Sequence, residues 1–178
     1  MSPNSTSKDQ AVITMGENRL SIEDVVAIAR NQKTLALNRT KGFVNKIQAG
    51  AEFLAKTLKE KGTIYGVTTG YGDSCTQAIP PELVHDLPIH LTRFHGCGLG
   101  KFFNEETTMA ILVTRLNSLS QGYSGVSYGL LEKIEAFLKH GILPLIPEEG
   151  SVGASGDLPP LSYVDAALRG ERTVRYKG

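Results

Sequence analysis

Apolar residues recur every three to four positions along much of this 178-residue chain, which is the pattern of amphipathic helices. Ser21, followed by Asp24 three residues later, has the pattern of an N-cap and predicts a short helix that begins there. Pro88 is expected to kink the helix that contains it. The longer helices are predicted over about residues 40–60, 83–95, 104–121, 128–140 and 159–169. The predicted fold class is therefore mainly α.

The segments between these helices are short and rich in glycine. Residues 13–20 predict a pair of short strands around the turn at Gly16, and residues 63–67 predict a single strand. Glycines that follow one another closely favour irregular backbone and close approach of other atoms. Irregular loops are therefore predicted at residues 66–72, 96–100 and 150–156.

The first ten residues are polar and differ from the rest of the chain. Residues 1–10 predict a disordered tail, and they lack the apolar stretch of a secretory signal. Residues 11–178 contain neither an internal repeat nor a low-complexity linker. They are expected to form one domain or part of one.

Composition excludes several classes of protein. The chain is 40% hydrophobic and 21% charged, and 19 basic residues against 18 acidic ones give a formal net charge of +1. Such a balance provides no broad field for binding nucleic acid or an anionic membrane, and no run of about 18 apolar residues predicts a membrane span. Two cysteines form neither a disulfide framework nor a zinc cluster, and the histidines lack metal-ligand partners. A cytoplasmic protein without a metal is expected.

The glycine-rich loop at residues 150–156 carries the first candidate chemistry. It lacks the lysine of a phosphate-binding loop and the spacing of a dinucleotide-binding loop, and a capping turn before the next helix is its simplest interpretation. Ala154-Ser155-Gly156 also permits a backbone cyclisation. Gly156 has no Cβ to block a sharp fold-back of the chain, and Ser155 has a hydroxyl that can be eliminated. The product is an electrophile built from backbone atoms.

Three segments together resemble the histidine, phenylalanine and tyrosine ammonia-lyase family, which also contains aminomutases. Residues 150–162 are similar to the family signature, residues 64–72 to its Tyr-Gly-Val-x-Thr-Gly-aromatic-Gly segment, and residues 115–125 to the helix and turn between them. The resemblance covers most of the chain and keeps the family order. It implies that the triplet cyclises to 4-methylidene-imidazole-5-one (MIO), with Asp157 supporting its formation.

The same resemblance implies roles for residues far from the triplet. Tyr65 matches the tyrosine that removes the β-proton of the substrate, although a lone tyrosine on a strand is more often a core residue. The pKa of a phenol in water is about 10, so this role needs groups that stabilise the phenolate. Gly72 is expected to contribute to substrate binding, within a loop whose glycines suit either a closing lid or a rigid turn.

Phe94 and His95 match the pair that lines the pocket for the substrate side chain in this family. Their combination differs from the Ser-His, Phe-Leu and His-Leu pairs typical of enzymes for histidine, phenylalanine and tyrosine. His95 offers a hydrogen bond to an imidazole or a phenol, and Phe94 adds apolar bulk that favours an aromatic ring. A histidine at a helix end is also often only a partner of the helix dipole.

The resemblance therefore implies an ammonia-lyase that converts L-histidine or L-tyrosine, with L-phenylalanine as a further option, to the α,β-unsaturated acid. An aromatic amino acid 2,3-aminomutase uses the same residues and is the nearest alternative. A different class of function, an inactive N-terminal fragment that serves only as a folding unit, is the third interpretation. The family also implies a homotetramer, and a lyase domain that would continue beyond residue 178, in which this chain is the N-terminal portion.

Overall fold

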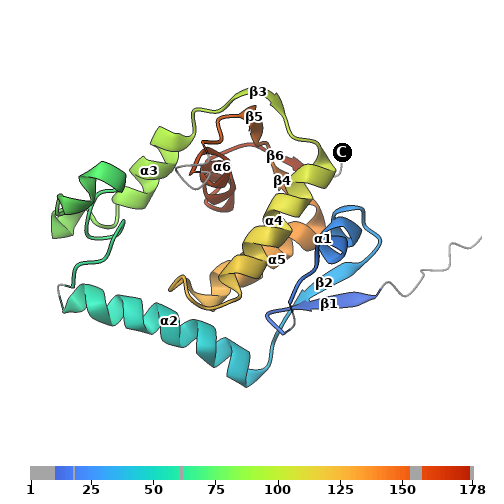
Figure 1. Ribbon diagram of the computed structural model, residues 1–178, viewed down its shortest axis with the longest axis horizontal. Coiled ribbons are helices and arrows are strands. Elements are labelled where there is room, and N and C mark those ends of the chain that lie inside the picture. The colour runs from blue at the N-terminus through green and yellow to red at the C-terminus, as the bar shows by residue number, and fades with distance from the viewer. Residues whose placement is uncertain (1–10, 18, 61, 153–157, 177–178) are drawn as a thin grey trace, which may run out of the picture.

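A computed structural model describes residues 11–17, 19–60, 62–152 and 158–176. The predicted disordered tail, residues 1–10, and the triplet with Asp157 lie outside the described residues. The described chain is mainly helical, as predicted, and its short strands pair two at a time (Figure 1). No helix in this described part is long and apolar enough to cross a membrane.

The N-terminal residues form a β–α–β unit. Strand β1 (Val12–Met15) is followed by α1 (Ile22–Ala29) and by β2 (Thr34–Leu37), and the two strands are parallel. Ser21 caps α1 in a capping box with Asp24, as predicted. The predicted strand pair within residues 13–20 is wrong, because a parallel partner needs a long crossover and α1 provides it.

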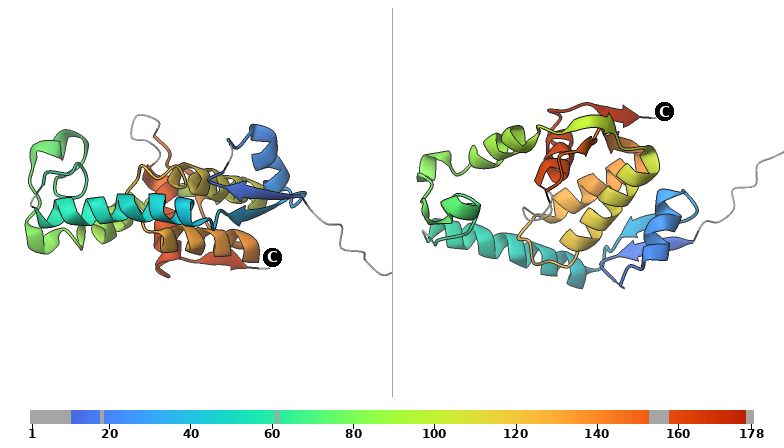
Figure 2. Two further views of the ribbon diagram at one scale, coloured as in Figure 1. Left: turned by 90° about the horizontal axis from the view of Figure 1, so that it is seen from below. Right: turned by 45° about the horizontal axis from the view of Figure 1, so that its top comes forward.

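Helix α2 (Lys41–Lys59) begins after its N-cap Thr40 and leaves the core along its length. Only Phe43 and Ile47 are buried in it, and the side chain of Phe53 is 72% exposed. Both views of the ribbon show α2 as an arm whose far end carries the segment in green, residues 62–86 (Figures 1 and 2). The amphipathic pattern predicted the helix, but its C-terminal half has little to pack against in the described chain.

The segment after α2 differs from its prediction in two ways. Residues 63–67 do not form a strand: residues 63–64 are irregular and residues 65–68 form a turn, for reasons given with the site below. Short 3₁₀ turns, η1 (Gly72–Thr76) and η2 (Pro81–Leu83), then precede α3 (Leu87–His95). Pro88 lies in the first turn of α3 and is not a kink, because its missing N–H costs nothing there.

The core lies where α1, α4 (Glu105–Leu119) and α5 (Tyr128–His140) pack together with the β1–β2 pair. Asn104 and Ser127 cap α4 and α5 with their side chains, and Gly141 ends α5 in the left-handed conformation. Completely buried side chains of this core include Leu112, Val113, Leu116, Leu131, Ile134 and Ile146.

The C-terminal third adds two antiparallel strand pairs and one helix. Strand β3 (Leu99–Phe102) pairs with β5 (Pro147–Glu149), and β4 (Ile142–Pro144) pairs with β6 (Val174–Tyr176). Helix α6 (Leu158–Leu168) lies against α3, and it confirms the last predicted helix.

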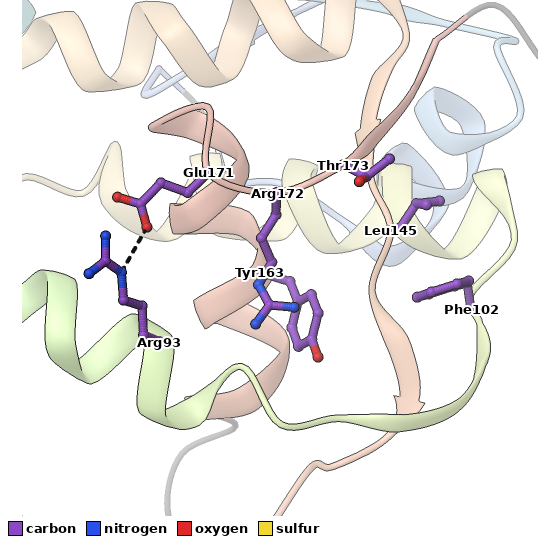
Figure 3. A pocket seen from close by; sticks show the side chains of 7 residues that line it. All are labelled: Arg93, Phe102, Leu145, Tyr163, Glu171, Arg172 and Thr173. Atoms are coloured by element: carbon purple, nitrogen blue, oxygen red, sulfur yellow. Dashed lines mark hydrogen bonds and ion pairs between the residues drawn. The ribbon is translucent and has the colours of Figure 1, made fainter.

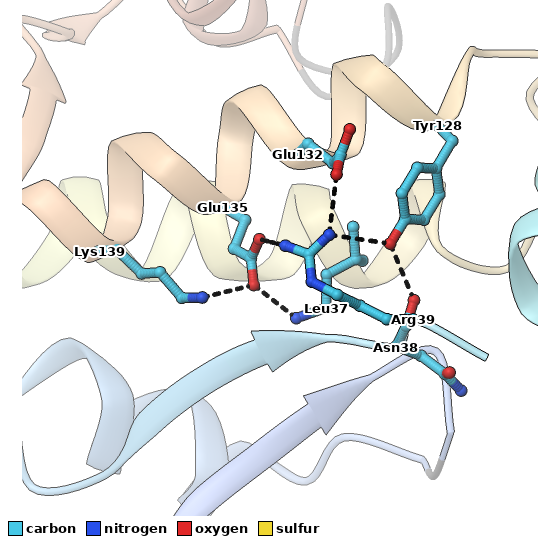
Figure 4. Close-up of polar contacts among 7 residues, drawn as sticks. All are labelled: Leu37, Asn38, Arg39, Tyr128, Glu132, Glu135 and Lys139. Carbon is cyan, nitrogen blue, oxygen red and sulfur yellow. Dashed lines mark hydrogen bonds and ion pairs between the residues drawn. The ribbon is translucent and has the colours of Figure 1, made fainter.

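A buried carboxylate joins the β–α–β unit to α5. One oxygen of Glu135 accepts hydrogen bonds from the backbone N–H of Leu37 at 2.7 Å and from Lys139 Nζ at 2.8 Å, and the other accepts from Arg39 at 2.6 Å (Figure 4). Burial by itself would raise the pKa of Glu135, but the hydrogen bonds from Lys139 and Leu37 and the charges of Lys139 and Arg39 hold it below its ordinary value. Glu135 is therefore an anion that the fold stabilises.

Replacing this carboxylate tests its contribution. Glu135→Gln should lower the free energy of unfolding at pH 7 by about 2–3 kcal/mol, because a charged acceptor with several donors is lost. Since the folded pKa is lowered, this contribution is complete above the unfolded pKa of about 4.3 and disappears as pH falls through the folded value. Urea unfolding of both proteins at pH 7 and at low pH measures the difference, which should shrink in acid.

Glu132→Gln is the matched control on the same helix. Glu132 is half exposed, and Arg39 is its one partner in this cluster. Its replacement should therefore lower the free energy of unfolding by less than about 1 kcal/mol. A Glu135→Gln protein as stable as the control, or a difference that grows in acid, would contradict this account.

Candidate functional site

The loop that carries Tyr65 is held in turns by threonine hydroxyls. Thr68 Oγ1 accepts the backbone N–H of Ile64 at 2.8 Å, and Thr69 Oγ1 accepts that of Gly66 at 3.1 Å. These bonds replace the strand ladder that the sequence suggested. Gly66 has φ +69°, and a Cβ there would lie 2.7 Å from the ring of Tyr71, so only glycine fits.

Two of the predicted site residues are bonded to each other in this loop. The phenol oxygen of Tyr65 accepts a hydrogen bond from the backbone N–H of Gly72 at 2.9 Å. Gly72 has φ +54°, a conformation that favours glycine. The Tyr65 side chain is 64% exposed. The arrangement presents an accessible phenol oxygen whose negative charge a backbone donor can stabilise.

The neighbouring tyrosine is in a different environment. Tyr71 meets Tyr65 edge to face, with ring centroids 6.2 Å apart. Burial and the proximity of Tyr65 raise the pKa of Tyr71 above its ordinary value. Tyr71 therefore remains protonated near neutral pH.

Phe94 and His95 lie in the last turn of α3 and contact each other. Their rings are 5.2 Å apart in an edge-to-face arrangement, and the Phe94 side chain is 79% exposed. The Nδ1 atom of His95 lies 2.9 Å from the carbonyl oxygen of Leu91. Because a carbonyl oxygen only accepts, Nδ1 must donate, and a neutral ring then has Nε2 as a hydrogen-bond acceptor.

The end of α3 that carries this pair is attached to α6. Thr92 Oγ1 donates to Asp165 at 2.8 Å, and Tyr163 Oη donates to the carbonyl oxygen of Gly96 at 3.1 Å. The sequence gives no sign of these contacts. A hydroxyl bonded to a backbone carbonyl leaves no motif in the sequence, and Thr92 and Asp165 are 73 positions apart.

The residues on both sides of the triplet lie close together. Gly150 has φ +149°, and a Cβ there would be 3.2 Å from Gly98 Cα and 3.3 Å from Pro159 Cβ. The chain therefore enters residues 151–158 and leaves them at neighbouring points, and α6 begins at Leu158.

The structure brings the predicted residues together in pairs rather than in one cluster. In the described chain, Tyr65 is bonded to Gly72, and Phe94 contacts His95, but no hydrogen bond or ring contact joins the two pairs. Residues 62–86 lie at one end of α3, and α6 lies at its other end (Figures 1 and 2). The triplet lies outside the described residues, and its role is a prediction.

A cavity of about 550 Å³ lies beside the α3–α6 contact (Figure 3). It contains none of the predicted site residues. Among the described residues no group of His, Cys, Asp and Glu side chains has the arrangement of a metal site. The cavity is lined by Arg93, Phe102, Leu145, Tyr163, Glu171, Arg172 and Thr173.

The sequence and the fold match known proteins over almost the whole chain. The family of aromatic amino acid lyases matches residues 20–178. A histidine ammonia-lyase from Streptococcus gordonii is 37% identical over 167 residues, which are 94% of this chain and 32% of that protein. A tyrosine aminomutase from Streptomyces globisporus superposes with a TM-score of 0.84 at 35% identity, and the match covers 95% of this chain and 31% of that one.

A third match is the ergothionase of Treponema denticola, with a TM-score of 0.85 at 28% identity over 94% of this chain and 33% of that one. The matches agree on a mainly helical lyase fold, of which this chain supplies the N-terminal portion. The chain belongs to the aromatic amino acid lyase family. It spans about one third of the length of the curated relatives that it matches.

Proposed function

We propose that this chain provides the base and the electrophile of an ammonia-lyase for aromatic amino acids. The observation that carries the proposal is the hydrogen bond from the Gly72 N–H to the phenol oxygen of Tyr65. It holds an accessible oxygen in a fixed position and stabilises the charge that a base must carry. Membership of the aromatic amino acid lyase family supplies the reaction class.

In the proposed reaction Tyr65 removes one proton from the β-carbon of the substrate. The electrons of that C–H bond form the Cα–Cβ double bond, and the Cα–N bond breaks to release ammonia. No oxidant or reductant is required. The backbone N–H of Gly72, 2.9 Å from the phenol oxygen, stabilises negative charge on that oxygen.

We assign the triplet to the MIO group that the family resemblance implies. Ala154, Ser155 and Gly156 would form the group with the support of Asp157. When present, MIO is an electrophile that turns the substrate amine into a better leaving group.

The substrate class follows from His95. Its Nδ1–H is engaged with Leu91, so the neutral ring offers Nε2 to a donor. A tyrosine phenol and a histidine imidazole both have such a donor, whereas the phenylalanine ring has none. The ring of Phe94 beside it favours an aromatic side chain. L-histidine and L-tyrosine are the proposed substrates.

An aromatic amino acid 2,3-aminomutase is the second candidate. The similarity to tyrosine aminomutase at 35% identity favours it, and the same base and electrophile serve both reactions. An aminomutase returns ammonia to the β-carbon, so the position of the amine in the product separates the two functions.

The mass of the protein tests whether the electrophile forms. The native polypeptide that contains these residues should be lighter than its sequence by two water molecules, because cyclisation and elimination at Ser155 each release one. Ser155→Ala should have the full mass and should release no ammonia. Intact mass spectrometry decides the point, and an unmodified wild-type protein would favour the inactive folding unit.

Substitution of Tyr65 tests the base. Tyr65→Phe should lower kcat by about 100-fold or more, because proton removal loses its acceptor. Ammonia and the conjugated acid are measured with histidine, tyrosine and phenylalanine in turn. The fold should persist, since the lost hydroxyl is largely solvent-accessible.

Tyr71→Phe is the matched control, since it removes a hydroxyl from the adjacent ring of the same loop. Its kcat should stay within about a few-fold of the wild-type value. Undiminished turnover by Tyr65→Phe would remove Tyr65 from the role of base.

A further inference from the structure

The carbonyl group that follows His95 accepts two hydrogen bonds from distant parts of the chain. Arg172 donates to the Gly96 oxygen at 2.7 Å and Tyr163 donates to it at 3.1 Å. Both donors belong to α6 or to the residues after it, and they are 76 and 67 positions away from Gly96. The C-terminal end of α3 is thus fixed by side chains rather than by solvent.

The two donors also support each other. The guanidinium carbon of Arg172 lies 4.2 Å from the centroid of the Tyr163 ring, which is a cation–π contact. Figure 3 shows the two side chains together at the edge of the cavity. A planar guanidinium that is stacked on a ring has few alternative orientations, so its N–H remains directed at the carbonyl oxygen.

Gly96 leaves space for this contact. A Cβ at this position would be 2.2 Å from Arg172 Nη2 and 2.9 Å from its Cζ. The φ of Gly96 is −74°, outside the left-handed range that favours glycine, so the effect of a Cβ here is steric and falls on the Arg172 side chain. A methyl group here would displace the guanidinium.

Further bonds fix the same turn of α3. The buried Thr92 donates to Asp165 at 2.8 Å, and Arg93 pairs with Glu171 at 3.4 Å. His95 therefore lies between two anchored residues. Thr92 is bound to α6, and Gly96 is bound to α6 and to Arg172, which follows α6 in the chain. The backbone of His95 is held on each side, and the bond from Nδ1 to Leu91 then sets the direction of Nε2.

We propose that Arg172 and Tyr163 are positioning residues for substrate selection, and that they act through His95. The inference rests on the proposed function, in which His95 accepts a hydrogen bond from the substrate ring. Both residues hold the Gly96 carbonyl, and so they hold the imidazole where that bond forms. Neither is required to touch the substrate.

The test measures kcat/KM for tyrosine, histidine and phenylalanine in the native polypeptide. Arg172→Met should lower the preference for the better polar substrate over phenylalanine by about ten-fold or more, since a charged donor is lost. Tyr163→Phe, which keeps the ring under Arg172, should lower it by about five-fold. Gly96→Ala should resemble Arg172→Met.

A double-mutant cycle separates positioning from general damage. In the background of His95→Ala, Arg172→Met should change the preference no further, because the residue through which it acts is gone. Gly42→Ala is the control, since a Cβ there meets nothing within 4 Å and the site lies elsewhere. Equal effects of Arg172→Met with and without His95 would overturn the proposal.

Hydrogen–deuterium exchange tests the anchoring independently of turnover. Amides of residues 91–98 should exchange faster by about five-fold or more in Arg172→Met and Gly96→Ala than in wild type or Gly42→Ala. Unchanged exchange in both variants would overturn the proposal. If the wild-type protein releases no ammonia, but the two variants still exchange faster than it does, the result contradicts the proposed function and leaves the anchoring established.

Discussion

The buried carboxylate of Glu135 is the constraint on which the arrangement depends. It binds the last residue of β2, Leu37, to α5, and it also binds Arg39, two residues further on (Figure 4). Tyr128 Oη donates to the carbonyl oxygen of Asn38 at 3.1 Å, so the chain is fixed up to the cap of α2. The direction of α2 is set at this joint. Because α2 is an arm that carries the Tyr65 loop at its far end, a polar contact in the core determines where the proposed base lies.

Helix α6 has the corresponding role on the other side. Pro159 in its first turn lies close to Gly150, and its later residues bind the end of α3 that carries Phe94 and His95. Helix α6 therefore links Gly150 to the residues proposed to select the substrate. The Tyr65 loop is joined to the same unit through α3, whose N-terminal end follows that loop in the chain (Figure 1).

Much of this could be predicted where the signal is local. The caps at Ser21 and Ser127, the stop at Gly141 and the periodicity of the long helices are all properties of a few neighbouring residues. The strand predictions failed because their outcome depends on distant or competing partners. Hydroxyls of Thr68 and Thr69 take the amides that a strand at residues 63–67 would use, and β1 finds its partner beyond α1. The resemblance implied separate site roles for Tyr65 and Gly72, and nothing in the sequence indicated the hydrogen bond between them.

The central claim is that Tyr65 and the triplet act on the same substrate. A structure of the native polypeptide with a bound aromatic amino acid tests it most directly. The account predicts Tyr65 Oη within about 3.5 Å of the substrate β-carbon, with the amine at residues 154–156 and the side chain against His95. A different base at that carbon, with Tyr65 out of reach of it, would contradict the account.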